Sequence, residues 1–284
     1  MDNKKNKVAA SANRTTYDID AIPKNLNDAP HIKHASIRQL YSNLINQVYK
    51  HSKKFSAIPQ VLDLGAGAGS ATLPFLELGA RVVAVDISRT QLDALQNKCK
   101  LFTDKLELRC EDISETLKKK DQKFDIVVAN SFLHHIPDYS SLITDALDLL
   151  TPNGQFFSFQ DPLRYDTVNK FTKTFSNLAY ISWRIFKGDV LGGIKRRLRR
   201  SRGIYLIDSL HDNVEYHVVR NGVDQNAIAS LLMKAGFDCN IVPYFSTHSS
   251  FFQILGNTLG LKNTFAIIAR NSHTHSMDDS TINK

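Results

Sequence analysis

Three glycines spaced two residues apart follow a short apolar run that ends at Leu64; they are Gly65, Gly67 and Gly69. Glycine has no Cβ, so the backbone can turn sharply there and a ligand can lie directly against it. The following residues, from Ser70 onward, have helical spacing, and a helix start directs unpaired N–H groups at such a ligand. A strand, a glycine loop and a helix in this order are typical of a nucleotide-binding site.

The acidic residue before this loop indicates which kind of nucleotide it would bind. A dinucleotide site has the pattern G-x-G-x-x-G, but the chain has Ser70 or Thr72 where the last glycine should stand. Asp63 precedes the first glycine by two positions, and its carboxylate would repel a pyrophosphate but attract an ammonium group. The loop therefore favours a nucleotide that carries an amino acid.

Two further acids end the next predicted strands. Asp86 closes the apolar run 81–86, and an acid about 20 residues after the loop can accept hydrogen bonds from ribose hydroxyls. Dehydrogenases and methyltransferases share this feature, so it indicates a nucleotide without choosing between them. Asp112 follows the alternating run 105–110. It could contact the nucleotide, and it could equally be the N-cap of a short helix over 113–120.

Three stretches together resemble class I S-adenosylmethionine-dependent methyltransferases. VLDLGAGAGSAT resembles their first motif, FDIVVANSFLHHIPD their fourth, and LLTPNGQFFSF their L-x-P-G-G turn, with Asn153 for the first glycine because Asn tolerates positive φ. The resemblance implies S-adenosylmethionine as the cofactor. The residues it implies as cofactor ligands are Asp63, Gly65, Ala66, Gly67, Gly69, Asp86, Ile87, Asp112, Ile113, Asn130 and Ser131.

Two adjacent histidines follow the fourth predicted strand, where the resemblance implies that the methyl group emerges. An imidazole titrates near neutrality and can take a proton from a hydroxyl. We prefer His135 as this base, with His134 and His211 as alternatives, and a pocket-wall role also remains open. Residues 130–133 read NSFL and lack the [DNS]-P-P-[YFW] tetrad of enzymes that methylate base amino groups.

The elements that must position these residues alternate along the chain. Apolar runs at 61–64, 81–86, 105–110, 124–130 and 155–160 alternate with segments of helical spacing, and 240–245 and 264–270 read as two closing strands. The pattern predicts an α/β, Rossmann-like, doubly wound seven-stranded sheet. The sheet is mainly parallel, the resemblance implies an antiparallel last strand, and a helical lid is inserted after the fifth strand.

The expected organisation divides the chain into six parts. They are a disordered tail at 1–29, a cap helix at 30–60, the S-adenosylmethionine-binding core at 61–160, a substrate lid at 161–223, the rest of the core at 224–271 and a disordered tail at 272–284. His31, His34 and Tyr41 of the cap either face the pocket or face solvent.

Composition sets limits on the class of protein. The chain has 284 residues, of which 42% are hydrophobic and 23% charged, as in ordinary globular proteins. Its three scattered cysteines predict free thiols, with no disulfide and no metal site. No apolar run approaches the roughly 20 residues of a membrane span, and the start lacks a secretory apolar segment. We therefore expect a cytoplasmic protein.

The net charge of +8 is concentrated in one segment. Residues 184–202 hold eight basic side chains and one acid. Phe186, Val190, Ile194 and Leu198 share one helical stripe there, as in helices that lie on membrane surfaces. The alternatives are a clamp for an anionic acceptor and a solvated face, and RNA contact has no supporting domain.

Together these features predict transfer of a methyl group from S-adenosylmethionine to a small or lipid-linked acceptor, which could be anionic, at oxygen rather than nitrogen or carbon. Peripheral membrane contact through 184–202 is part of this interpretation. The alternatives are an NAD(P)-dependent oxidoreductase on the same sheet, a methyltransferase acting on nitrogen, carbon or RNA, and a non-catalytic cofactor-binding module.

Overall fold

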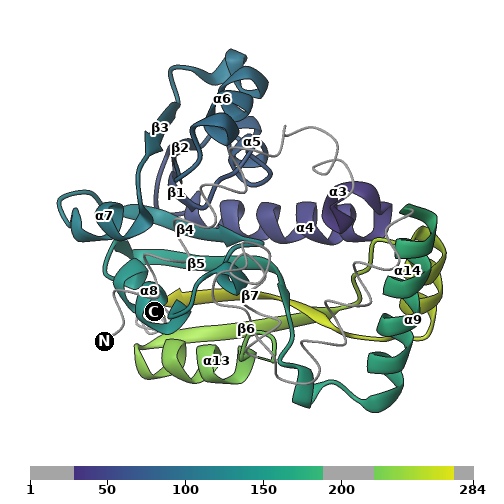
Figure 1. Cartoon of the computed structure of the whole chain (residues 1–284). Helices are drawn as coiled ribbons and strands as arrows, with labels where there is room; N and C mark the ends of the chain where they lie inside the picture. Colours follow the sequence, from purple (N-terminus) through teal and green to yellow (C-terminus); the bar gives the residue numbers. More distant parts are fainter. Residues whose placement is uncertain (1–28, 188–220, 272–284) are drawn as a thin grey trace, which may run out of the picture.

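A seven-stranded sheet forms the centre of the computed structural model, which describes residues 29–187 and 221–271 (Figure 1). Its order is β3-β2-β1-β4-β5-β7-β6. The strands are β1 Gln60–Leu64, β2 Arg81–Asp86, β3 Leu106–Cys110, β4 Phe124–Asn130, β5 Leu150–Pro162, β6 Phe237–Tyr244 and β7 Thr264–Asn271. Strands β1 to β5 pair in parallel, and β7 is antiparallel to both β5 and β6. The predicted Rossmann-like sheet with an antiparallel last strand is confirmed.

Helices cover both faces of the sheet because the buried strands are apolar on both sides. The helices are α3 Pro30–Lys33, α4 Ala35–Ser52, α5 Thr72–Glu77, α6 Arg89–Lys98, α7 Ile113–Lys118, α8 Tyr139–Leu147, α9 Lys170–Lys187, α13 Gln225–Lys234 and α14 Ser250–Thr258, with 3-10 turns η1 Lys100–Phe102, η2 Leu133–His135 and η3 Tyr165–Thr167. One core contains Ile126 and Val128 of β4 with α4 and α5, and the other contains Val127 and Ala129 with α8 and α13. Alternate residues of β4 thus point to opposite layers.

Three local features differ from the sequence prediction. The cap helix expected over 30–60 is broken at His34, whose φ of −96° and ψ of 123° end α3 and begin α4, and it ends at Ser52. Residues 151–154 interrupt the pairing of β5 with β4. Leu150 before them pairs with Phe124, and Gln155 after them pairs with Ile126. Helix α14 was not predicted, because its apolar residues are exposed and unaccompanied by charges.

The explanation given for Asn153 was wrong. Neither Asn153 nor Gly154 adopts a positive φ. A Cβ on Gly154 would lie 2.9 Å from both the Leu150 Cβ and the Thr151 carbonyl oxygen. The turn therefore requires glycine at its second position for space.

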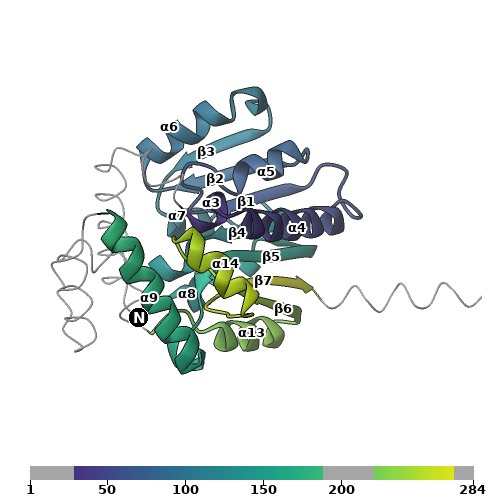
Figure 2. The same ribbon diagram turned by 90° about the vertical axis from the view of Figure 1, so that its right-hand side faces the viewer.

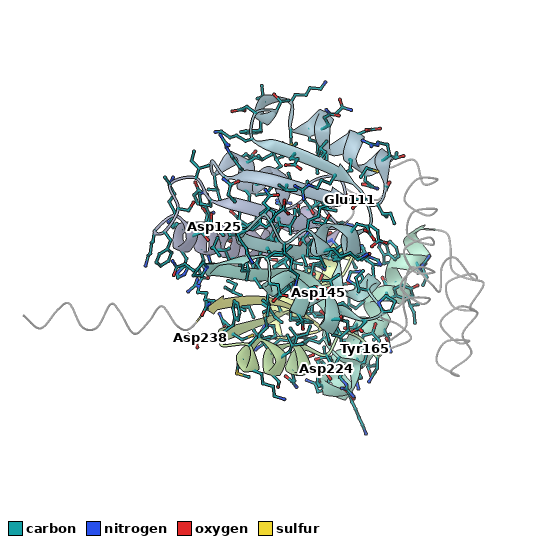
Figure 3. All side chains as sticks on the ribbon, turned by 90° about the vertical axis from the view of Figure 1, so that its left-hand side faces the viewer. Glu111, Asp125, Asp145, Tyr165, Asp224 and Asp238 are labelled. Carbon is teal, nitrogen blue, oxygen red and sulfur yellow. The ribbon has the colours of Figure 1, made fainter. Side chains whose placement is uncertain are left out.

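The chain leaves the sheet after β5 and returns to the same place before α13. Leu163 bridges Val223, and the Tyr165 N–H donates to the Asn221 carbonyl at 2.6 Å. Figure 3 shows Tyr165 and Asp224 close together at this point, with Asp125 and Asp238, near the starts of their strands, on the opposite side. Beyond this junction, α9 runs beside α14 (Figure 2). Residues 188–202 of the basic segment, and His211, lie outside the described residues.

Candidate active site

The glycine loop turns at the carboxyl end of β1. Gly65, Gly67 and Gly69 have φ of 70°, 52° and 86°, a backbone region that L side chains rarely adopt. A Cβ on Gly65 would lie 2.2 Å from the Phe132 ring, so that ring packs directly on the start of the loop. The Gly67 N–H donates to Asp86 Oδ2 at 2.8 Å. The loop is therefore fixed from two sides before any ligand binds.

Asp63 lies beneath this loop with one oxygen satisfied and one not. Its side chain is 1% exposed, and Oδ2 accepts a hydrogen bond from Thr72 Oγ1 at 2.5 Å. Oδ1 is buried and has no partner among the described residues. Burial, with a smaller contribution from Asp86, raises the pKa of Asp63 to about 7. Buried polar atoms are nearly always paired, so this oxygen suggests a missing cationic donor.

Asn130, at the end of the neighbouring strand β4, repeats the pattern. Its Nδ2 donates to Ser70 Oγ at 2.7 Å, while Oδ1 is buried without a partner among the described residues. Ser131 follows with φ of 54°, a left-handed conformation that is uncommon outside glycine, and its N–H donates to the Phe159 carbonyl at 2.6 Å. Two unsatisfied acceptors on adjacent strands fit an ammonium group, as the amino-acid end of S-adenosylmethionine requires.

The two acids predicted for the nucleoside are held by backbone N–H groups. Asp86 accepts from Gly67 and from Ser88, both at 2.8 Å. Asp112 accepts from the Ser114 N–H at 2.8 Å as the N-cap of α7, which was the alternative role considered for it. Each carboxylate oxygen has two lone pairs, so both acids keep capacity for ribose or adenine donors. The assignments of these acids, and of Ala66, Ile87 and Ile113, remain predictions.

His134 is anchored by a carboxylate that the sequence analysis did not single out. Asp161 Oδ1 lies 2.8 Å from His134 Nδ1 and 3.1 Å from the His134 backbone nitrogen, which donates to it. Asp161 is 0% exposed, and its burial raises its pKa to about 7, against the opposing effect of the backbone N–H of His134. An ionised Asp161 accepts from Nδ1–H, which leaves Nε2 as the basic nitrogen of the ring. The rings of His134 and His135 lie 4.0 Å apart.

A buried aromatic cluster adjoins the loop on the side of the N-terminal helices. Tyr41 contacts Phe159 with ring centroids 4.5 Å apart, and its hydroxyl donates to the Ser70 carbonyl at 3.2 Å. His31 is 7% exposed, both of its ring nitrogens are buried without partners among the described residues, and burial lowers its pKa to about 4. His34 is also 7% exposed, with Nε2 2.7 Å from the Thr247 carbonyl oxygen. The solvent-facing alternative for these three residues was wrong.

The chain is similar in sequence to known methyltransferases. Residues 62–156 match the family model described as a methyltransferase domain. The ubiquinone biosynthesis O-methyltransferase of Coxiella burnetii (strain RSA 331 / Henzerling II) is 28% identical over 187 residues, which cover 62% of this chain and 76% of that protein. The protein of the same name from Rhodopseudomonas palustris (strain HaA2) is 32% identical over 111 residues, covering 37% and 42%.

Solved structures share the fold at low identity. Magnesium protoporphyrin IX methyltransferase from Synechocystis PCC 6803, with bound SAH, has a TM-score of 0.50 at 15% identity and covers 94% of this chain and 95% of that one. An N-methyltransferase from Bradyrhizobium japonicum WM9 also has a TM-score of 0.50 at 15% identity, covering 93% and 98%. The family model and the curated relatives favour the methyltransferase over the nicotinamide-dependent alternative, and the solved structures show the shared fold. They differ in the molecules they act on, so the fold leaves the acceptor open.

Proposed function

The chain belongs to the class I S-adenosylmethionine-dependent methyltransferases, and from this premise we propose that it methylates a hydroxyl oxygen of a small acceptor. The observation that carries the choice of oxygen is the pair of His134 and Asp161. A hydroxyl must lose its proton during methylation, and an imidazole held by a buried carboxylate is suited to take it. The curated relatives are named O-methyltransferases, which supports the same choice.

The residues around the loop suit the cofactor. When bound, S-adenosylmethionine supplies a methyl group on a sulfonium, which is an activated leaving group. We propose that Asp63 and Asn130 accept hydrogen bonds from its ammonium group, since each has one buried oxygen without a partner among the described residues. Asp86 would accept the ribose hydroxyls, and Asp112 the adenine amino group. The protein's main contribution is then alignment of the two reactants.

The chemistry assigned to the chain itself is a single proton transfer. His134 Nε2 would take the proton of the acceptor hydroxyl, and the oxygen's electron pair would form the new bond to the methyl carbon as the carbon–sulfur bond breaks, its electron pair staying on sulfur in S-adenosylhomocysteine. Asp161 would hold the ring and stabilise the imidazolium that forms, because its carboxylate already contacts Nδ1 at 2.8 Å. Asp161 is thus a positioning residue, and His134 takes the catalytic role for which the sequence favoured His135.

This proposal is tested by the product of the reaction. The purified chain is incubated with S-adenosylmethionine and matched soluble phenols and anilines, and the products are identified by mass spectrometry. We expect methyl ethers and S-adenosylhomocysteine. Methylated amines alone would contradict oxygen as the acceptor atom. A thermal shift with NAD but none with S-adenosylhomocysteine would contradict the cofactor.

We propose further that the acceptor is anionic or lipid-linked. The relatives are named for ubiquinone biosynthesis, and the segment 184–202, with eight basic residues and one acid, accounts for nearly all of the chain's net charge of +8. Replacing Arg196, Arg197, Arg199 and Arg200 by glutamine should lower binding to anionic vesicles or raise the KM for a negatively charged acceptor. The effect should shrink at high salt, because screening weakens exposed charges. If both quantities are unchanged at low salt, the segment is only a charged surface.

A further inference from the structure

Helices α9 and α14 each expose a stripe of large apolar side chains. On α9 the exposed residues are Phe171 (60%), Leu178 (53%), Ile181 (37%) and Ile185 (57%), and on α14 and its C-cap they are Phe251 (70%), Ile254 (70%), Leu255 (36%) and Leu259 (49%). Their spacings of three, four and seven residues place each set on one face of its helix. Most of the exposed large apolar residues of the described chain therefore lie on these two helices.

The two stripes belong to one surface. Phe175 of α9 contacts Phe252 of α14 at 5.2 Å between ring centroids, and it contacts Phe245 at 5.7 Å. Gly256 of α14 packs so closely on Phe245 that a Cβ would lie 2.3 Å from its ring. Both helices thus rest on Phe245 through their buried sides, and their apolar stripes face away from the body. Figure 2 shows helices α9 and α14 next to each other on the face toward the viewer.

The charged side chains of the two segments that form this surface have one sign. Residues 168–187 and 245–263 contain no aspartate or glutamate. Lys170, Lys173 and Arg184 follow one side of the α9 stripe, and Lys262 is exposed just beyond α14. An apolar face bordered by basic side chains matches the boundary between acyl chains and anionic headgroups. It is not suited to crossing a bilayer, and no helix in the described part of the chain is long and apolar enough to do so.

The surface is joined to the proposed active site by short connections. Gln160, which precedes Asp161, donates from Nε2 to Ser246 Oγ at 2.7 Å, in the loop that leads to α14. His34, beside the aromatic cluster, contacts the Thr247 carbonyl oxygen in the same loop. The loop that leads to α14 is therefore in direct contact with the residue that precedes Asp161 and with the N-terminal helices.

We propose that the exposed face of α9 and α14, the docking face, binds the surface of an anionic phospholipid bilayer. Phe171, Phe251 and Ile254 would enter the headgroup boundary, while the neighbouring lysines contact lipid phosphates. The inference deepens the proposed function, since a lipid-linked acceptor gives such a contact its use. The binding itself requires neither cofactor nor acceptor and can be measured alone.

The test is sedimentation of the full chain with vesicles. We expect it to bind vesicles of phosphatidylcholine with phosphatidylglycerol, and to bind phosphatidylcholine alone much less. The double variant Phe251→Ser, Ile254→Ser should lower the bound fraction by about tenfold, because two anchors are lost. Phe171→Ser should lower it through the other helix. The matched control is Leu101→Ser, Met233→Ser, which removes residues 90% and 57% exposed elsewhere and should bind like the wild type.

Three outcomes would overturn the docking face. The wild type could fail to bind anionic vesicles, or the double variant could bind them as well as the wild type. The third outcome is that gel filtration shows a dimer for the wild type and a monomer for the double variant, while neither protein binds vesicles. Unchanged melting temperature and S-adenosylhomocysteine affinity show that the variants are folded. Methylation of a soluble phenol separates the two proposals, because the double variant should retain it. Vesicle binding without any methyl transfer would contradict the proposed function and leave the docking face standing.

Discussion

Replacing His134 by alanine should lower kcat by about 10²- to 10⁴-fold for a hydroxyl acceptor, the range typical of a lost general base. The affinity for S-adenosylhomocysteine should stay near that of the wild type, because the His134 contacts described here are to Asp161 and His135. Single-turnover kinetics with saturating S-adenosylmethionine, together with calorimetric binding of S-adenosylhomocysteine, measure the two quantities separately.

His135→Ala is the matched control for this prediction, since its ring lies 4.0 Å from that of His134. We expect a much smaller loss of kcat for it. Asp161→Asn should lower kcat while preserving most of the substrate affinity, and it should alter the pH profile of kcat/KM, which a purely structural residue would leave in place. If His135→Ala is the more damaging variant, the base is His135, as the sequence alone suggested. If both retain wild-type turnover, neither histidine takes the proton.

The fold was largely predictable because its signals are local. The apolar runs of β1, β2 and β4 have lengths and flanking turns that only a buried parallel sheet satisfies, and β2 and β4 begin and end where the sequence placed them. The glycine loop and Asp63 were visible for the same reason, since a sharp turn beside an acid is written in consecutive residues.

The parts that were missed depend on contacts between distant residues. In the sequence, Asp161 follows the predicted strand 155–160 and precedes a proline, which by itself indicates only a chain turn. Its role arises because Gln160, with φ of 69°, re-aims the chain so that the next carboxylate meets His134, 27 residues earlier in the sequence. Helix α14 was missed because no charged residue marks a polar face on it, and it is held by the fit of Gly256 on Phe245.

Asp63→Asn should weaken S-adenosylhomocysteine binding by roughly tenfold to a hundredfold at pH 8, because a hydrogen bond to a charged group contributes about 1.5–3 kcal/mol. Asparagine keeps an oxygen to accept from Thr72 Oγ1, so the geometry beneath the loop is preserved. Asp125→Asn is the control, since Asp125 accepts the Gln60 N–H at 2.9 Å where β1 and β4 begin, at the opposite end of these strands from the glycine loop. It should leave the affinity unchanged.

The pH dependence gives this prediction its sharpest form. Without ligand, the pKa of Asp63 is raised from its ordinary 3.8 to about 7, and an ammonium group binds best to the ionised carboxylate. The wild-type affinity should therefore rise by about tenfold between pH 6 and pH 8, as the proton is lost. The sign for stability is opposite: the folded state holds this proton more tightly, so Asp63 lowers the free energy of unfolding as pH rises from about 4 to about 7. In Asp63→Asn the slope in affinity should disappear and the slope in stability should become smaller, because Asp161, whose pKa is also raised to about 7, still contributes to it. An affinity that stays independent of pH in the wild type would show that Asp63 is not the group that receives the cofactor's charge.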